Sequence, residues 1–177
     1  HRGMVMVSKE STPFHFWSVP TREYPQAGVI TALYKDDDGH IVSGVEGEGV
    51  FKITSEGNIT DHLFSGKTVS SIYKDYSGNL WFGGYYSGLY MQDAKGNVRF
   101  MLPEIKLKDI KKITGDDKGN LYLSLFGSGF IRYHLPTQTV TEYQSSSGGL
   151  RNNWIYTLLL DSRERLWIGH CNGVDYF

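Results

Sequence analysis

A turn followed by a short strand of apolar and aromatic residues recurs along the chain and constrains its fold more than any other feature. In each copy an Asp lies three residues before a Gly, or before Glu164 in the last copy, and the copies begin at Asp36, Asp75, Asp116 and Asp161. Their spacings are 39, 41 and 45 residues. Each turn is followed by HIVSG, NLWFG, NLYLS or RLWIG, and then by a Gly-initiated strand at Gly49, Gly88, Gly129 or Gly173. A period of about 40 residues with several short strands is typical of β-propeller blades.

The pattern predicts an all-β fold, a β-propeller fragment of about four four-stranded antiparallel blades. We expect a single propeller segment over residues 1–177, with no separate domain. Complete blades are predicted at 29–64, 68–100 and 108–143, and a partial blade at 154–177. Residues 1–28, with GMVMV from Gly3 and PFHFWSV over 13–19, are predicted to supply the outer strands of another partial blade.

The strands are apolar on both faces, as Leu80, Trp81 and Phe82 in succession show. Stacked blades bury both faces of each sheet, whereas a two-layer sandwich would show cleaner alternation. Equivalent strand positions hold Trp81, Tyr122 and Trp167, so we expect these three rings in the core. The stretch IKLKDIKKI at 105–113 is also compatible with a helix; a strand is favoured because the other units place their first strand there.

Two segments carry a family resemblance: GLRNNWIYTLLLDSRERLWIGHCNGVDYF (149–177) and DYSGNLWFGGYYSGLY (75–90). Both resemble the two-component regulator propeller repeat, which builds the extracytoplasmic sensor region of hybrid histidine kinases typical of gut Bacteroidetes. The chain departs from the repeat at HIVSG, which lacks the Trp, and at Glu164-Arg165, where Gly-Asn is usual.

The resemblance implies a periplasmic segment that takes part in sensing an oligosaccharide and is not itself an enzyme. It implies that the kinase belongs to another part of the parent protein. The expected partners are the ligand, the remaining blades and the adjacent sensor domain.

Candidate binding residues follow from the face on which each loop lies. Strands in a blade alternate in direction, so the second-to-third loops and the inter-blade links share one face, here called the variable face. Loops on a rigid scaffold are where binding residues concentrate. Tyr85 and Tyr86 could stack on a sugar or another planar group. The remaining candidates are hydrogen-bonding or aromatic residues of the same face: Glu46, Glu48, Arg151, Asn153 and Trp154. Alternatively, one of the two tyrosines packs between blades and the other candidates are merely solvated.

Other classes of function find little support in the sequence. The 18 basic and 19 acidic side chains nearly balance, which argues against nucleic-acid or membrane-surface binding. DDDGH at 36–40 suggests calcium, but an EF-hand loop would need Glu where Gly47 stands. His170 and Cys171 are adjacent and point to opposite sides of a strand end. We therefore predict no metal, no cofactor and no catalytic residue.

Two alternatives stay open. One is a propeller lyase or glycoside-active enzyme whose acidic groups converge at the central channel. The other is a protein-interaction scaffold. Ring closure is also open, because GVDYF at 173–177 duplicates the strand that GMVMV would supply. We expect either an open arc or two chains that complete one ring as a homodimer.

Overall fold

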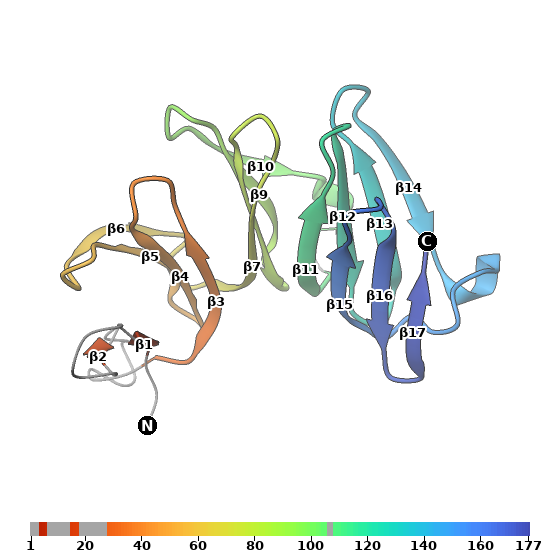
Figure 1. The fold of residues 1–177 in the computed structure, drawn as a ribbon, viewed down its shortest axis with the longest axis horizontal. Helices are drawn as coiled ribbons and strands as arrows, with labels where there is room; N and C mark the ends of the chain where they lie inside the picture. The colour runs from red at the N-terminus through yellow and green to blue at the C-terminus, as the bar shows by residue number, and fades with distance from the viewer. Residues whose placement is uncertain (1–3, 7–14, 18–27, 106–107) are drawn as a thin grey trace. The chain divides into compact units, whose positions relative to one another are not determined.

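The computed structural model describes residues 4–6, 15–17, 28–105 and 108–177, and it forms strands joined by short turns (Figure 1). The strands predicted from Gly3 and over 13–19 lie partly outside these residues, as do residues 20–27, which lead to the first complete blade. The chain divides into two compact units, His1–Val69 and Ser70–Phe177, which are treated separately below. The strands pair antiparallel with their neighbours, and the predicted all-β propeller class is confirmed.

The first unit holds one two-stranded and one four-stranded sheet. The small sheet pairs β1 (Met4–Met6) with β2 (His15–Trp17). The larger sheet has the order β3 (Ile30–Lys35), β4 (Ile41–Val45), β5 (Gly49–Ile53) and β6 (Ile59–Leu63). Each strand therefore pairs with the next one along the chain, as the sequence pattern requires.

The second unit holds two four-stranded sheets and a three-stranded one. The first comprises β7 (Thr68–Lys74, beginning just before the unit boundary), β8 (Leu80–Tyr85), β9 (Gly88–Gln92) and β10 (Val98–Met101). The second comprises β11 (Ile110–Gly115), β12 (Asn120–Leu125), β13 (Gly129–His134) and β14 (Thr139–Tyr143). The last comprises β15 (Ile155–Leu160), β16 (Leu166–His170) and β17 (Gly173–Tyr176).

Two single 3₁₀ turns, Pro103–Ile105 and Ser145–Ser147, lie in the links between these sheets. The ambiguous stretch at 105–113 enters β11 at Ile110, so the favoured strand is confirmed over Ile110–Ile113. Residues 106–107 lie outside the described part.

The recurring Asp holds each turn to the strand that follows it. Asp75 Oδ1 accepts the backbone N–H groups of Ser77 and Asn79, each at 2.9 Å. Its Oδ2 accepts the indole N–H of Trp81 at 2.8 Å. Gly78 closes the turn at φ 87°, a left-handed conformation that Gly adopts without steric cost. One carboxylate thus satisfies turn donors and a buried ring at once.

The same geometry recurs in the next two sheets. Asp161 Oδ2 accepts the indole N–H of Trp167 at 2.8 Å, and Asp116 Oδ2 accepts the hydroxyl of Tyr122 at 3.4 Å. Burial, followed by the charge and hydrogen bond of Asp116, raises the pKa of Tyr122 to about 12. Glu164 occupies the Gly position with φ 62°, so this departure from the repeat leaves a non-Gly residue in the left-handed region.

The three predicted core rings differ in burial, because a neighbouring sheet packs against two of them and not against the third. Trp81 is 2% exposed and meets Tyr133 edge-on at 6.2 Å between ring centroids. Tyr122 is 7% exposed and packs with Ile155, Leu158 and Ile168 of the last sheet. Trp167 is only partly buried, so its assignment to the core is wrong. It packs beside Arg165 and the exposed Tyr176, because no further sheet covers that face in the described residues.

Candidate functional site

Tyr85 and Tyr86 form the tip of the turn between β8 and β9. Tyr86 has φ 45°, which turns the chain sharply, and the two rings meet edge-on with centroids 4.3 Å apart. Tyr85 is 53% and Tyr86 59% exposed. The alternative in which one of them packs between blades is therefore wrong. The neighbouring Tyr86 phenol, with some desolvation, raises the pKa of Tyr85, so the Tyr85 hydroxyl stays protonated at neutral pH.

Three further aromatic rings meet at the start of the last sheet. Phe126, in the turn between β12 and β13, lies edge-on to Trp154 at 4.8 Å and to Tyr156 at 5.1 Å. Trp154 and Tyr156 are each more than half exposed. Gly127 lies beside the Trp154 indole, and a Cβ added there would be in van der Waals contact with it at 3.8 Å.

Lys111 joins the two groups of rings. Its Nζ lies 5.0 Å from the centroid of the Phe126 ring and 5.9 Å from that of Tyr85, within the range of cation–π attraction. Asp109 Oδ2 holds the ammonium at 3.0 Å. We call Tyr85, Tyr86, Phe126, Trp154 and Tyr156 the aromatic surface, with Lys111 between its two parts. It spans all three sheets of the second unit.

Asp109 is fixed where β11 begins. Its carbonyl accepts the N–H of Phe126 at 2.9 Å, which ties it to the turn that carries the Phe126 ring. Its side chain is 8% exposed, and Oδ1 is buried without a hydrogen-bond partner among the residues that the structure describes. A buried carboxylate oxygen without a donor is rare in folded proteins and calls for a physical explanation.

The sequence prediction missed Lys111, Asp109, Tyr156 and the role of Phe126, although the repeat carries a signal for most of them. Lys111 and Tyr156 each stand five residues before the turn Asp of their unit, while Asp109 and Trp154 stand seven before it. Phe126 lies in a second-to-third loop, like Tyr85 and Tyr86. Aligning the units on the turn Asp would have placed these positions together at the variable end of the first strand.

Arg151 and Asn153 belong to the link before β15 and fasten that link. Asn153 Oδ1 accepts the N–H of Ser145 at 2.8 Å, and its carbonyl accepts the N–H of Gly129 at 3.1 Å. The backbone N–H of Arg151 donates to Asp175 Oδ2 at 2.8 Å, and its guanidinium Nε lies 3.5 Å from Oδ1. The contacts of both residues hold the link that leads to Trp154.

Glu46 and Glu48 lie in the turn between β4 and β5 of the first unit. The Glu46 N–H donates to the Val29 carbonyl at 2.9 Å, and the Glu48 carbonyl bonds the His62 ring at 2.6 Å. The Glu46 side chain is exposed and that of Glu48 partly so. The aromatic surface is built by the second unit alone, so these two carboxylates form a separate candidate.

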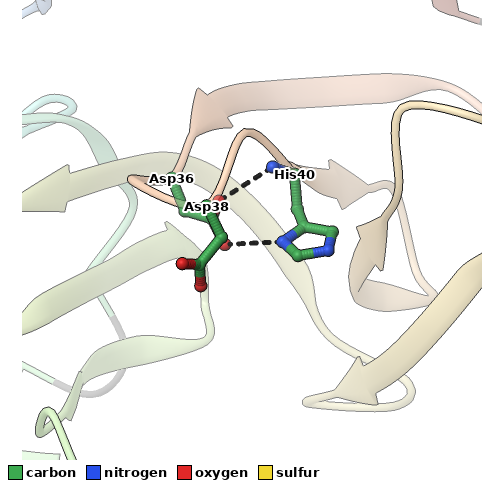
Figure 2. Close-up of side chains that lie close together, drawn as sticks. All are labelled: Asp36, Asp38 and His40. Atoms are coloured by element: carbon green, nitrogen blue, oxygen red, sulfur yellow. Dashed lines mark hydrogen bonds and ion pairs between the residues drawn. The ribbon is translucent and has the colours of Figure 1, made fainter.

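One group of side chains in the described residues has ligand atoms close enough for a metal: Asp36, Asp38 and His40, within 4.8 Å of one another (Figure 2). Asp36 already has protein partners. Its Oδ1 accepts the His40 N–H at 2.8 Å, and its Oδ2 lies 2.7 Å from Lys52 Nζ. Burial raises the pKa of Asp36, but Lys52 and the His40 N–H outweigh it and hold that pKa below its usual value. The lysine ammonium supplies the positive charge that a cation would bring.

Comparisons with known proteins agree with the repeat. The family described as two component regulator propeller matches residues 63–86 and 149–172. Histidine kinase P4 of Formosa agariphila is 28% identical over 170 aligned residues, which cover 83% of this chain and 12% of that protein. The chain therefore spans about an eighth of the length of this relative.

Solved structures share the fold. The extracellular domain of BT4673 from B. thetaiotaomicron has a TM-score of 0.80 at 20% identity, covering 99% of this chain and 24% of that one. The extracellular domain of the hybrid two component system BT3049, from the same organism, has a TM-score of 0.77 at 24% identity, covering 92% and 23%. Virginiamycin B lyase from Staphylococcus aureus has a TM-score of 0.72 at 15% identity, covering 98% and 61%.

Among the described residues no helix is long and apolar enough to cross a membrane. Both matched segments overlap the segments that carried the resemblance. Residues 63–86 and 149–172 therefore match the two-component regulator propeller repeat, and the chain shares the propeller fold of these extracellular domains.

Proposed function

We propose that this chain is a non-catalytic propeller segment of the periplasmic sensor region of a two-component system, and that it takes part in recognising an oligosaccharide. The aromatic surface carries this proposal. Four of its five rings are more than half exposed, Phe126 is partly buried, and the Lys111 ammonium lies over the Phe126 and Tyr85 rings. Aromatic rings offer flat apolar faces to the C–H faces of sugars, and polar groups beside them bond the hydroxyls.

The surface suits an extended ligand more than a small molecule. Tyr85 and Tyr86 come from one sheet, Phe126 from the next and Trp154 from the link to the third. A chain of several sugars can contact all three sheets together. Binding would signal only if the ligand contacts two arrangements of the sensor region differently. Such arrangements would involve the adjacent sensor domain and the remaining blades as partners.

The test is a binding screen by isothermal titration calorimetry with cellohexaose, laminarihexaose, mannohexaose, xylohexaose and an oligogalacturonate. We expect at least one to bind and to raise the unfolding temperature. Phe126→Ala should abolish that binding, and Tyr76→Ala should not, since Tyr76 is an exposed ring in a turn of the other face. Failure of all five sugars to bind a folded chain would contradict the proposal.

The lyase alternative rests on a likeness of fold. The lyase structure is 15% identical to this chain, a level at which only the architecture is shared. The group Asp36, Asp38 and His40 belongs to one turn, and Asp36 is paired with Lys52. A protein partner that packs on the aromatic surface is the second alternative. If Phe126→Ala abolished binding of a protein partner and no sugar bound to the wild-type chain, this second alternative would be supported.

Ring closure is a further proposal about partners. The last sheet has three strands where three other sheets have four, so β17 presents a free sheet edge within the described residues. Either an open arc or two chains completing one ring accommodates that edge. Size-exclusion chromatography with light scattering separates them: a monomer at high concentration excludes the paired ring.

A further inference from the structure

The Lys111–Asp109 pair is the polar centre of the aromatic surface, and its unused hydrogen-bonding groups define what a ligand must present. Lys111 Nζ has three N–H donors, and among the described residues its one hydrogen-bonding or charged partner is Asp109 Oδ2 at 3.0 Å. Asp109 Oδ1 has no donor. The pair therefore offers spare donors and one spare acceptor side by side.

Charge decides which ligand fits these groups. The ammonium and the carboxylate neutralise each other, so the pair has no net attraction for an anion. A carboxylate or sulfate could accept from Lys111 but could donate nothing to Asp109 Oδ1, and it would be repelled by that oxygen. A hydroxyl group can do both, because its oxygen accepts while its hydrogen donates. Two neighbouring hydroxyls would satisfy the ammonium and the orphan oxygen together.

Access to Oδ1 requires side-chain movement that the surface permits. Oδ1 is covered in the free protein, while the Lys111 side chain is 33% exposed and Tyr85 53% exposed. Exposed side chains change rotamer on the picosecond to nanosecond scale, and the inference requires that such a movement uncovers Oδ1. The free protein then carries the cost of an unsatisfied buried acceptor, and the ligand removes it.

We infer that Asp109 and Lys111 form a diol-binding centre that selects neutral oligosaccharides with adjacent free hydroxyls, Asp109 accepting from one hydroxyl and Lys111 donating to its neighbour. This inference rests on the proposed function and sharpens it. The rings would hold the sugar by its apolar face, and the pair would choose between neutral and acidic sugars.

The test compares four chains by calorimetry with the neutral hexasaccharide that binds best and with an oligogalacturonate: wild type, Asp109→Asn, Lys111→Met and Lys112→Met. Lys112 is the matched control, since it neighbours Lys111 on β11 and its side chain is exposed. We expect Asp109→Asn and Lys111→Met each to weaken the neutral sugar about tenfold or more, the loss expected for a charge-assisted hydrogen bond. Lys112→Met should stay within about twofold of wild type.

A chemically altered ligand separates a binding role of Asp109 from a structural one. Full O-methylation removes the hydroxyl donors of the sugar and keeps its oxygens as acceptors. It should weaken binding about tenfold or more in wild type and about threefold or less in Asp109→Asn, because that variant has already lost the carboxylate acceptor. Urea unfolding of each variant confirms that it is folded.

The outcomes are distinct. Sugar binding that is lost in Phe126→Ala but unchanged in Asp109→Asn and Lys111→Met would overturn this inference and leave the proposed function standing. Tighter binding of the oligogalacturonate than of every neutral sugar would do the same. Absence of binding to any sugar would overturn both.

Discussion

Lys52 Nζ lies 2.7 Å from Asp36 Oδ2. In two other sheets the corresponding Asp oxygen accepts an indole N–H instead. The residue that aligns with those Trp rings is Val42, which has no donor, and Lys52 is its cross-strand partner on β5. The first complete sheet therefore replaces a hydrogen bond along the strand with an ion pair from the neighbouring strand. The Asp36 carboxylate thus keeps a partner although HIVSG lacks the Trp of the repeat.

Lys52→Met should destabilise the first unit by about 1 kcal/mol, because it leaves the largely buried Asp36 carboxylate without its cation. The Lys52 side chain is 34% exposed, which keeps the effect modest. Urea unfolding followed by circular dichroism measures it. Lys35→Met, an exposed lysine on β3, is the control, and an equal loss in both variants would contradict the assignment.

Trp81→Phe should destabilise the second unit more than Trp167→Phe does. Both changes remove an indole N–H that donates to an Asp carboxylate at 2.8 Å. Only Trp81 is fully buried, so its replacement also leaves unfilled volume between two sheets. We expect losses of about 3 kcal/mol for Trp81→Phe and about 1 kcal/mol for Trp167→Phe. Equal losses in urea unfolding would show that packing against the next sheet matters little.

Asp161 should make stability depend on pH in the acid range. The Trp167 indole N–H, together with N–H groups of Arg165 and Arg163, outweighs partial desolvation and holds the pKa of Asp161 below its ordinary 3.8. The folded state then binds the proton less tightly than the unfolded state. The stabilisation is present above pH 3.8 and is lost as the pH falls from there toward the folded-state pKa.

Urea midpoints at pH 7, 4 and 3 test this expectation. Asp161→Asn should show a smaller fall in midpoint over that range than wild type. Asp117→Asn, a change at an exposed residue of the preceding turn, should behave like wild type. An identical fall in all three chains would contradict a role for Asp161.

Gly83→Ala should destabilise the packing between the first two sheets of the second unit. A Cβ at Gly83 would lie 2.7 Å from Ile110 Cγ2 and 3.0 Å from Ile113 Cδ1, closer than packed carbon atoms approach. We expect a loss of about 2 kcal/mol from overpacking. Ile110→Ala removes the nearer methyl, so the double variant should lose less than the sum of the two single changes. Additive losses would mean that the clash is relieved by backbone movement.

The sequence was most informative where the repeat dictates local structure. A turn Asp followed by an apolar or aromatic strand predicts a hairpin, and four aligned copies of this pattern predict the blades. The strand over Ile110–Ile113 followed from its place in the period, although its apolar residues also fit a helix. Tyr85 and Tyr86 could be placed on the variable face because strand direction alternates within a blade.

Burial and neighbourhood required the tertiary structure. Trp81 and Trp167 are equivalent in sequence, yet only Trp81 has a sheet packed on its face in the described residues. The aromatic surface has the same origin: Tyr85, Phe126 and Trp154 are separated by tens of residues. The stacking of sheets brings Tyr85 and Phe126 beside Lys111, and Trp154 against Phe126. A repeat fixes what each unit contains by itself, whereas a surface shared by three sheets depends on how the side chains of different units meet.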